Sequence, residues 1–401
     1  MTDRETDNLQ REAPEGGGKR VKKTRRGSLG RAVGLVLLLA AVLGVVVIVA
    51  YGDTNNFDNL RRMLTFNKNP SAAEERTELY SFDSDRTNLF ELMGDNLLVV
   101  SSTRMTLLSA GQETLVNESV KLAHPAVVCV GDTAAVYDVG GTALYLVTAK
   151  GTVRDLTGEA PGEILSASLN AQGDLALTTN KSGYKSAVSV YDAGFTPRFT
   201  FNSSDSYVAD ACVTDDGKHL AVVTLGEADG AFASTLTVYS LTSETPLSTA
   251  ALTGSLVLSV RNLGGKVCAL QDDRLTTFSF DGTLAGSCRF DYPYLRAQSL
   301  RGADFAAVLL SRYRSGNALQ LVTVDSDGAL LGMKNERREV LDVSAAGKYV
   351  AALYGDSLTV YTADLKEYAT LSGTNYAKRV IMRADGSALL IGSSGAWLYN
   401  P

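Results

Sequence analysis

A short unit recurs eight times after residue 78, and it constrains the fold more than any other feature of the sequence. Each copy is a glycine turn followed directly by an apolar run, as in GDNLLVV at Gly94, GKHLAVV at Gly217 and GKYVAAL at Gly347. The other copies are GDTAAVY at Gly131, GDLALTT at Gly173, GKVCALQ at Gly265, GADFAAV at Gly302 and GSALLIG at Gly386. Successive glycines lie 37 to 48 residues apart. This spacing is close to the roughly 40–45 residues of a four-stranded propeller blade.

A second strand is expected after each glycine turn, and an aromatic residue often ends it. These strands are predicted at residues 105–108, 144–147, 188–191, 236–239, 275–278, 319–322, 358–361 and 397–399. Asp or Gly turns then lead to a further strand, as in 149–156, 281–287 and 325–332. A sheet repeat of this length cannot bury both faces alone, so the copies must stack around a closed ring. We therefore predict an all-β fold with an eight-bladed β-propeller at residues 77–401, with seven blades as the alternative.

The two ends of this region indicate how the ring closes. The eighth unit stops at Pro401, directly after its third strand, whereas residues 78–83 (ELYSFD) form a strand that precedes the first unit. We predict that this early strand completes the last blade, so that its edge is paired within the ring.

The segment from Ala32 to Tyr51 is uncharged and almost entirely apolar over twenty residues. At 1.5 Å per residue a helix of this length is about 30 Å long, which matches the hydrocarbon layer of a bilayer. Seven Lys/Arg and no acid lie between Lys19 and Arg31, so the positive-inside rule predicts a cytoplasmic N-terminus. A cleaved signal peptide is the alternative, but its apolar stretch is usually only about 7–15 residues long.

These features divide the chain into four parts. We predict a disordered basic cytoplasmic tail at residues 1–31, a transmembrane helix at residues 32–51, a juxtamembrane stalk at residues 52–76 and the extracytoplasmic propeller at residues 77–401. The membrane, reached through residues 32–51, is thus one predicted partner.

Charge separates the tail from the rest of the chain. The formal net charge is −6, yet residues 1–31 carry nine Lys/Arg against five Asp/Glu, which leaves 29 against 39, or −10, for the remainder. Lys and Arg that neutralise phosphates supply most of the affinity of nucleic-acid binders. We therefore expect no nucleic-acid partner.

Few residues are available for metal, redox or acid–base chemistry. The four cysteines are far apart, form no CxxC pair and lie in apolar runs, so free buried thiols are favoured over a disulfide: Cys129, Cys212, Cys268 and Cys288. The two histidines, His124 and His219, precede a strand and lie in a glycine turn, respectively. No G-x-S-x-G motif is present, although the members of a catalytic triad need not be close in sequence.

Two acidic turns begin like oxygen-ligand loops. DSDG at 325–328 lacks the later ligands of an EF-hand, and DDG at 215–217 has the composition of a solvated turn. A β-turn explains both segments. We predict no catalytic residue, no metal site and no cofactor.

Two of the repeated units resemble a known turn. DDGKHLAV at 215–222 and AGKYVAA at 346–352 look like the DGKxLAV turn of WD40-like, TolB-like and quinoprotein-like propellers, which marks a hairpin and carries no chemistry. The tryptophan-docking motif of quinoprotein dehydrogenases is missing, and the single Trp397 is expected to pack in the core. With its basic tail, anchor and stalk, the whole chain is similar to an uncharacterised family of membrane-anchored propeller proteins of Gram-positive (clostridial) bacteria.

Aromatic and arginine residues offer the best candidates for a binding surface. Tyr292-Pro293-Tyr294 and Arg312-Tyr313-Arg314 either line a ligand-binding face or pack as loops on a neighbouring blade. The sequence favours a non-catalytic binding or scaffold module for an unknown protein or cell-envelope component. The alternatives are an extracytoplasmic enzyme of the quinoprotein or hydrolase type and a sensor whose tail signals inward, because fold alone does not decide function.

Overall fold

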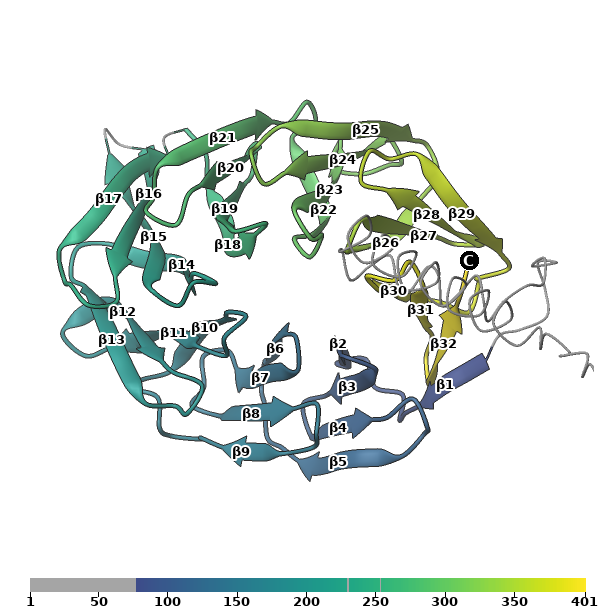
Figure 1. The fold of residues 1–401 in the computed structure, drawn as a ribbon, viewed down its shortest axis with the longest axis horizontal. Coiled ribbons are helices and arrows are strands. Elements are labelled where there is room, and N and C mark those ends of the chain that lie inside the picture. The colour runs from purple at the N-terminus through teal and green to yellow at the C-terminus, as the bar shows by residue number, and fades with distance from the viewer. Residues whose placement is uncertain (1–76, 229–230, 253) are drawn as a thin grey trace, which may run out of the picture. The chain divides into compact units, whose positions relative to one another are not determined.

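The computed structural model describes residues 77–228, 231–252 and 254–401. Within these ranges, eight antiparallel four-stranded sheets stand side by side around a ring (Figure 1). The eight-bladed prediction is confirmed, and the seven-bladed alternative is wrong. The predicted tail, transmembrane helix and stalk, at residues 1–31, 32–51 and 52–76, lie outside the described residues. No helix in the described ranges has the length and apolarity needed to cross a bilayer.

Each blade is numbered here in chain order, and its strands are given from the inner to the outer edge of the ring. Blade 1 comprises β2 (Leu89–Met93), β3 (Asn96–Val100), β4 (Arg104–Leu108) and β5 (Thr114–Ser119); blade 2 comprises β6 (Pro125–Val130), β7 (Thr133–Asp138), β8 (Leu144–Thr148) and β9 (Val153–Asp155). Blade 3 comprises β10 (Ile164–Leu169), β11 (Leu175–Lys181), β12 (Tyr184–Tyr191) and β13 (Pro197–Ser203); blade 4 comprises β14 (Tyr207–Val213), β15 (His219–Ala228), β16 (Ala231–Ser240) and β17 (Pro246–Leu252).

The second half of the ring follows the same order. Blade 5 comprises β18 (Val257–Leu263), β19 (Lys266–Gln271), β20 (Arg274–Phe278) and β21 (Leu284–Arg289); blade 6 comprises β22 (Tyr294–Ser299), β23 (Phe305–Ser311), β24 (Leu319–Asp325) and β25 (Leu330–Glu336). Blade 7 comprises β26 (Val340–Ala346), β27 (Tyr349–Tyr354), β28 (Ser357–Thr362) and β29 (Glu367–Ser372); blade 8 comprises β30 (Arg379–Met382), β31 (Ala388–Ile391), β32 (Gly395–Tyr399) and β1 (Thr77–Ser81).

The recurring glycine turn joins the first strand of a blade to the second. Gly94, Gly131 and Gly347 have φ angles of +60°, +56° and +54°, a left-handed conformation that glycine adopts without steric cost. In the second strand of a blade, the blade before covers one face and the blade after covers the other. Its sequence is therefore a continuous apolar run, and in β23 every residue is buried.

The ring has two faces. We call one the turn face, because it carries the turns that join first to second and third to fourth strands. We call the other the hairpin face, because it carries the second-to-third hairpins and the crossovers to the next blade. Inner strands therefore start at the hairpin face, and β1 starts at the turn face.

The hydrophobic core lies between blades rather than inside them. One buried cluster, for example, combines Leu98 of blade 1 with Val136 of blade 2, and another combines Val222 of blade 4 with Val190 of blade 3. Because each sheet packs on both neighbours, no blade could bury its apolar surface alone.

The predicted closure by the N-terminal strand is confirmed. β1 pairs antiparallel with β32, and Thr77 lies opposite Leu398. Tyr80 of β1 is fully buried at the seam between blades 8 and 1, and its hydroxyl donates a hydrogen bond to the carbonyl of Asp95. The strand runs from Thr77 to Ser81, so it begins and ends slightly earlier than the predicted 78–83.

Candidate functional site

The inner strands of blades 3 to 7 each contain a β-bulge near the hairpin face. In each pairing of an inner strand with its neighbour, the register skips one residue. The skipped residues, which we call the bulge ring, are Leu165, Ala209, Leu258, Arg296 and Leu341. A bulge leaves its extra residue unpaired and bends the strand, and bulges are frequent next to functional sites.

The bulge ring places leucine side chains in solvent at the inner edge of the propeller. Leu165, Leu258 and Leu341 are 39%, 42% and 43% exposed, although the residue before each of them belongs to the packing between blades. Figure 1 shows the inner strands facing one another around the centre of the ring. Tyr207, the first residue of β14, is 60% exposed on the same side. This set of exposed apolar side chains on blades 3, 4, 5 and 7 is typical of an interaction surface.

The local sequence explains why these leucines are exposed. Each one follows an aliphatic residue and precedes Ser or Asp: Ile164-Leu165-Ser166, Val257-Leu258-Ser259 and Val340-Leu341-Asp342. In a regular strand, neighbouring side chains point to opposite faces, both of which are buried in a blade. The bulge takes the leucine out of this alternation. The pattern of two aliphatic residues followed by Ser or Asp is visible in the sequence, but it looks like one buried run and was not predicted to be a site.

A buried carboxylate, Asp210, and a half-buried one, Asp342, hold two of the bulges and tie them to the next blade. Asp210 Oδ1 accepts the Ala211 N–H at 3.0 Å, while Oδ2 accepts the Val260 N–H at 2.9 Å and a guanidinium hydrogen bond from Arg261 at 2.7 Å. These hydrogen bonds therefore tie the bulge of blade 4 to the inner strand of blade 5.

Asp342 repeats this arrangement in blade 7. Its carboxylate accepts the N–H groups of Val343 and Val380, both at 3.0 Å. Burial raises the pKa of Asp342, and the two hydrogen bonds oppose this shift.

The structure brings the two predicted aromatic and arginine segments into one corner of the hairpin face. Tyr294 begins β22 and pairs with Ser311, and the Arg296 guanidinium donates hydrogen bonds to the carbonyls of Tyr313 and Arg314. Tyr292, nearby, packs against the hydrophobic cluster between blades 5 and 6, which supports the packing interpretation for this residue, whereas Tyr313 is 55% exposed.

The two histidines lie in different blades. His124 directly precedes β6 of blade 2, and its N–H donates to Asp138 at 2.6 Å. His219 begins β15 of blade 4, where its Nδ1 lies 3.2 Å from a carboxylate oxygen of Asp216. The prediction that His124 precedes a strand is confirmed, whereas His219 is the first residue of the strand after the glycine turn rather than part of the turn.

The acidic turns are held by their own carboxylates. Asp325 Oδ1 accepts the N–H groups of Asp327 and Ala329 at 2.9 and 2.7 Å. Partial burial opposes ionisation of Asp216, but hydrogen bonds from the Thr214 hydroxyl and the Lys218 N–H lower its pKa. These contacts support the β-turn interpretation of both segments. In the part of the chain that the structure describes, no three His, Cys, Asp or Glu side chains form a group that could hold a metal.

The four cysteines are free thiols, as predicted. Cys212 and Cys268 are buried as predicted, whereas Cys129 and Cys288 are half-buried, so the predicted burial is wrong for these two. Burial raises the pKa of Cys129 and that of Cys268 to about 12, so neither thiol ionises near neutral pH.

Trp397 differs from its prediction. It is half-buried rather than part of the core. Its ring and that of Tyr376 are arranged edge to face, with 4.7 Å between the ring centres. It lies on β32, one strand inside the outer edge of blade 8.

An ion pair crosses the interior of the ring. The Arg301 guanidinium, in the turn after β22 of blade 6, makes two hydrogen bonds of 2.6 and 2.8 Å with the carboxylate of Glu91 on β2 of blade 1. Blades 6 and 1 are not neighbours, because blades 7 and 8 lie between them on one side and blades 2 to 5 on the other. The pair therefore joins opposite parts of the inner wall near the turn face.

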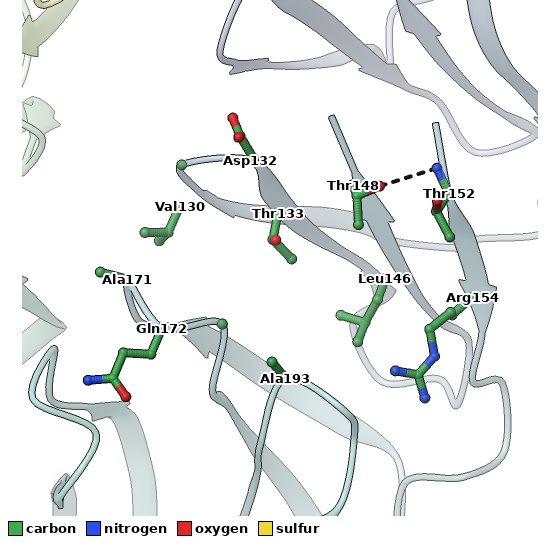
Figure 2. Close-up of a pocket in the computed structure, with 12 residues that line it drawn as sticks. Val130, Asp132, Thr133, Leu146, Thr148, Thr152, Arg154, Ala171, Gln172 and Ala193 are labelled. Atoms are coloured by element: carbon green, nitrogen blue, oxygen red, sulfur yellow. Dashed lines mark hydrogen bonds between the residues drawn. The ribbon is translucent and has the colours of Figure 1, made fainter. Parts of the chain in front are cut away.

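A pocket of about 460 Å³ lies on the turn face between blades 2 and 3, and Figure 2 shows it in close-up. Its lining residues are Val130, Gly131, Asp132, Thr133, Leu146, Thr148, Thr152, Arg154, Ala171, Gln172, Gly173 and Ala193. The sequence identifies Gly131 and Gly173 only as turn glycines and predicts no site here, because the pocket is formed by two blades that only the fold brings together.

Comparison with known proteins gives a family and a fold. Residues 67–392 match a family of unknown function (DUF5711). No curated protein matches the chain. The C-terminal WD40 domain of Sif2 is similar at 13% identity and a TM-score of 0.56, covering 81% of this chain and 98% of that one.

Two further solved structures share the fold. The computationally designed Ika8 protein has 10% identity and a TM-score of 0.54, covering 82% of this chain and 100% of its own. AztD from Citrobacter koseri has 10% identity and a TM-score of 0.50, covering 79% of this chain and 90% of its own. At these identities the likeness concerns the propeller fold alone.

Proposed function

Since the chain belongs to the DUF5711 family, whose function is unknown, we propose from its own geometry that it is a non-catalytic binding or scaffold module that engages a protein or a cell-envelope polymer through the bulge ring. The observation that carries this proposal is the exposure of Leu165, Leu258 and Leu341 at equivalent bulges of blades 3, 5 and 7. A partner that buried these leucines would gain a part of the ~1.5–3 kcal/mol that full burial of an exposed side chain gives, because more than half of each leucine is already covered.

The corner of blade 6 adds polar recognition to this apolar surface. Arg296 belongs to the bulge ring, and Tyr313 and Arg312 lie on the adjoining hairpin, where the Arg312 guanidinium is 5.7 Å from the centre of the Tyr313 ring. Tyrosine and arginine are enriched among the residues that dominate binding energy at interfaces. The combination supports a ligand that offers both apolar groups and hydrogen-bond acceptors.

We also propose that the propeller is displayed outside the membrane from an anchor at residues 32–51. The direction of β1 is consistent with this proposal. β1 starts at the turn face, so Thr77 lies there, whereas the bulge ring lies near the hairpin face. An enzyme and an inward-signalling sensor remain the competing proposals.

The test compares two triple variants of the full-length chain. Leu165→Asn, Leu258→Asn and Leu341→Asn change the bulge ring. Leu247→Asn, Leu284→Asn and Leu331→Asn form the matched control, because these leucines are 51%, 61% and 38% exposed on outer strands. Complexes are purified from detergent-solubilised membranes by a tag on each chain. We expect a partner that copurifies with the wild type and the control and is lost from the bulge-ring variant. Equal recovery with all three chains would contradict the proposal.

A further inference from the structure

The outer strand of blade 2 differs from those of its neighbours. In blades 1 and 3 to 7, the pairing of the third strand with the outer strand contains a β-bulge. In blade 2 the pairing is regular, with Leu146 opposite Arg154 and Val147 opposite Val153, and β9 has three residues. Blade 2 thus lacks the extra residue at this step.

The missing bulge coincides with an unusual side chain. Arg154 pairs with Leu146 of the third strand and faces the next blade. In blades 1 and 3 to 7, the outer-strand residue in the equivalent pair is, in this order, Val116, Phe199, Ser248, Gly286, Gly332 and Ala369. Where it is glycine, the turn of the next blade presses directly on the strand. A Cβ at Gly286 would lie 2.0 Å from the carbonyl oxygen of Asp327, and one at Gly332 would lie 2.8 Å from the backbone of Asp364.

Arg154 keeps the corresponding turn of blade 3 away from the strand. Its guanidinium donates a hydrogen bond to the carbonyl of Gly194 at 3.2 Å, so that turn is held at the far end of a long side chain. The pocket of about 460 Å³ lies beside this arginine and is lined by Ala193 of the same turn. This volume lies within the usual range of small-molecule sites.

The groups that point into the pocket are hydrogen-bond donors and apolar side chains. In Figure 2, Arg154, Thr133 and Leu146 point inward, whereas the carboxylate of Asp132 and the amide of Gln172 point away. Among the described residues, no carboxylate forms an ion pair with Arg154. A guanidinium without an acidic partner is suited to a carboxylate, which it binds through two parallel hydrogen bonds.

We propose that this pocket binds a carboxylate carried on a short apolar chain. The carboxylate accepts hydrogen bonds from Arg154 and Thr133, and the apolar chain packs against Leu146 and Ala193. A free small acid and the C-terminal residue of a peptide share this chemistry. The site is separate from the bulge ring and does not depend on the function proposed for it.

The experiment uses three probes with the full-length chain in lipid nanodiscs, and empty nanodiscs serve as the blank. N-acetyl-valine represents a peptide C-terminus, butyrate represents a free acid, and N-acetyl-valinamide lacks the carboxylate. Binding is measured by ligand-observed NMR at concentrations up to about 10 mM. We expect N-acetyl-valine to bind and N-acetyl-valinamide not to bind. Butyrate that binds as well indicates a free acid as the source, and butyrate that does not bind indicates a peptide C-terminus.

Three variants locate the site. Arg154→Gln removes the charge, and Ala193→Phe fills the pocket while leaving Arg154 in place. Arg289→Gln is the control, because Arg289 is an exposed arginine on the outer strand of blade 5. We expect binding to weaken about tenfold or more in the first two variants and to be unchanged in the third. Melting curves establish that each variant is folded.

The proposal would be overturned by any of three results: no acid binds, N-acetyl-valinamide binds as well as N-acetyl-valine, or folded Arg154→Gln and Ala193→Phe bind like the wild type. The bulge-ring triple variant should retain N-acetyl-valine, which keeps this test separate from that of the proposed function.

Discussion

At the scale of single residues, Tyr80 makes the main contacts that close the ring. Its side chain is fully buried against Leu97 and Leu389, one from each side of the seam, and its hydroxyl reaches the carbonyl of Asp95. Phe82, two residues later, is half-buried and packs against this cluster without being one of its fully buried members. The sequence pattern predicted the strand but not which of its aromatic residues is central, because a bulge at Leu79 changes the alternation.

Replacing Tyr80 should therefore cost more than replacing Phe82. Tyr80→Ala is expected to lower the free energy of unfolding by about 3–5 kcal/mol, because it leaves a cavity at the seam. Tyr80→Phe should cost about 1 kcal/mol through the lost hydrogen bond. Urea unfolding measures both. If Phe82→Ala is as costly as Tyr80→Ala, this account of the seam is wrong.

Asp342 gives a prediction for pH. Burial raises its pKa in the folded state, so the folded chain holds this proton more tightly than the unfolded chain does. Its contribution to stability is present below the ordinary Asp pKa of about 3.9 and is lost as pH rises through the raised value. The stability of the wild type relative to Asp342→Asn should thus fall as pH rises from about 4.

Asp364 supplies a control of opposite sign for this measurement. A hydrogen bond from Lys366 lowers the pKa of Asp364 to about 2. The stability of the wild type relative to Asp364→Asn should therefore rise between about pH 2 and pH 4 and then level off. Urea midpoints across pH test both signs, and a wild type that gains stability over Asp342→Asn with rising pH would contradict the first.

At the scale of elements, the repeat predicted the order of the strands but not their irregularities. The glycine turn and the apolar run after it have a fixed local cause, namely a left-handed residue and a strand covered on both faces. A bulge adds one residue to a unit whose length already varies from 37 to 48, so spacing cannot reveal it. The bulge ring depends on an extra residue in the inner strands, and the pocket beside Arg154 lies where the outer strand of blade 2 lacks an extra residue. Neither feature could therefore be predicted from the sequence pattern.

The closing strand can be tested by two truncations. A chain that starts at residue 74 keeps β1, whereas a chain that starts at residue 84 loses it along with Tyr80. The shorter chain should lose most of a stability of about 5–15 kcal/mol, because it gives up buried side chains and exposes the edge of β32. It should also aggregate through that edge. Equal melting temperatures for the two chains would show that the ring closes in another way.

At the scale of the whole molecule, the Glu91–Arg301 pair adds a contact across the ring to the contacts around it. Its two residues are 210 positions apart in sequence and belong to blades that are not neighbours. A double-mutant cycle with Glu91→Gln and Arg301→Gln should give a coupling of about 1 kcal/mol in urea unfolding, a modest value because the Arg301 side chain is 49% exposed. Strictly additive effects would mean that the pair contributes nothing in solution.

Membrane attachment is a prediction for the full-length chain. The protein should remain with membranes after carbonate extraction, because a helix at residues 32–51 would span the bilayer. Protease added outside protoplasts should digest the chain after Gly52 and spare residues 1–31. Recovery of a soluble secreted product that begins near Tyr51 would instead identify the segment as a cleaved signal peptide.

The position of β1 also determines how the ring would respond to mechanical tension. A force applied through the chain before Thr77 enters at the turn face and acts along the axis of β1. If a partner holds the hairpin face, the four residue pairs between β1 and β32 are loaded together in shear rather than opened one after another. Tension between anchor and partner would then be borne by the strand that closes the ring, and failure would begin at the seam between blades 8 and 1 while the other blades stayed folded.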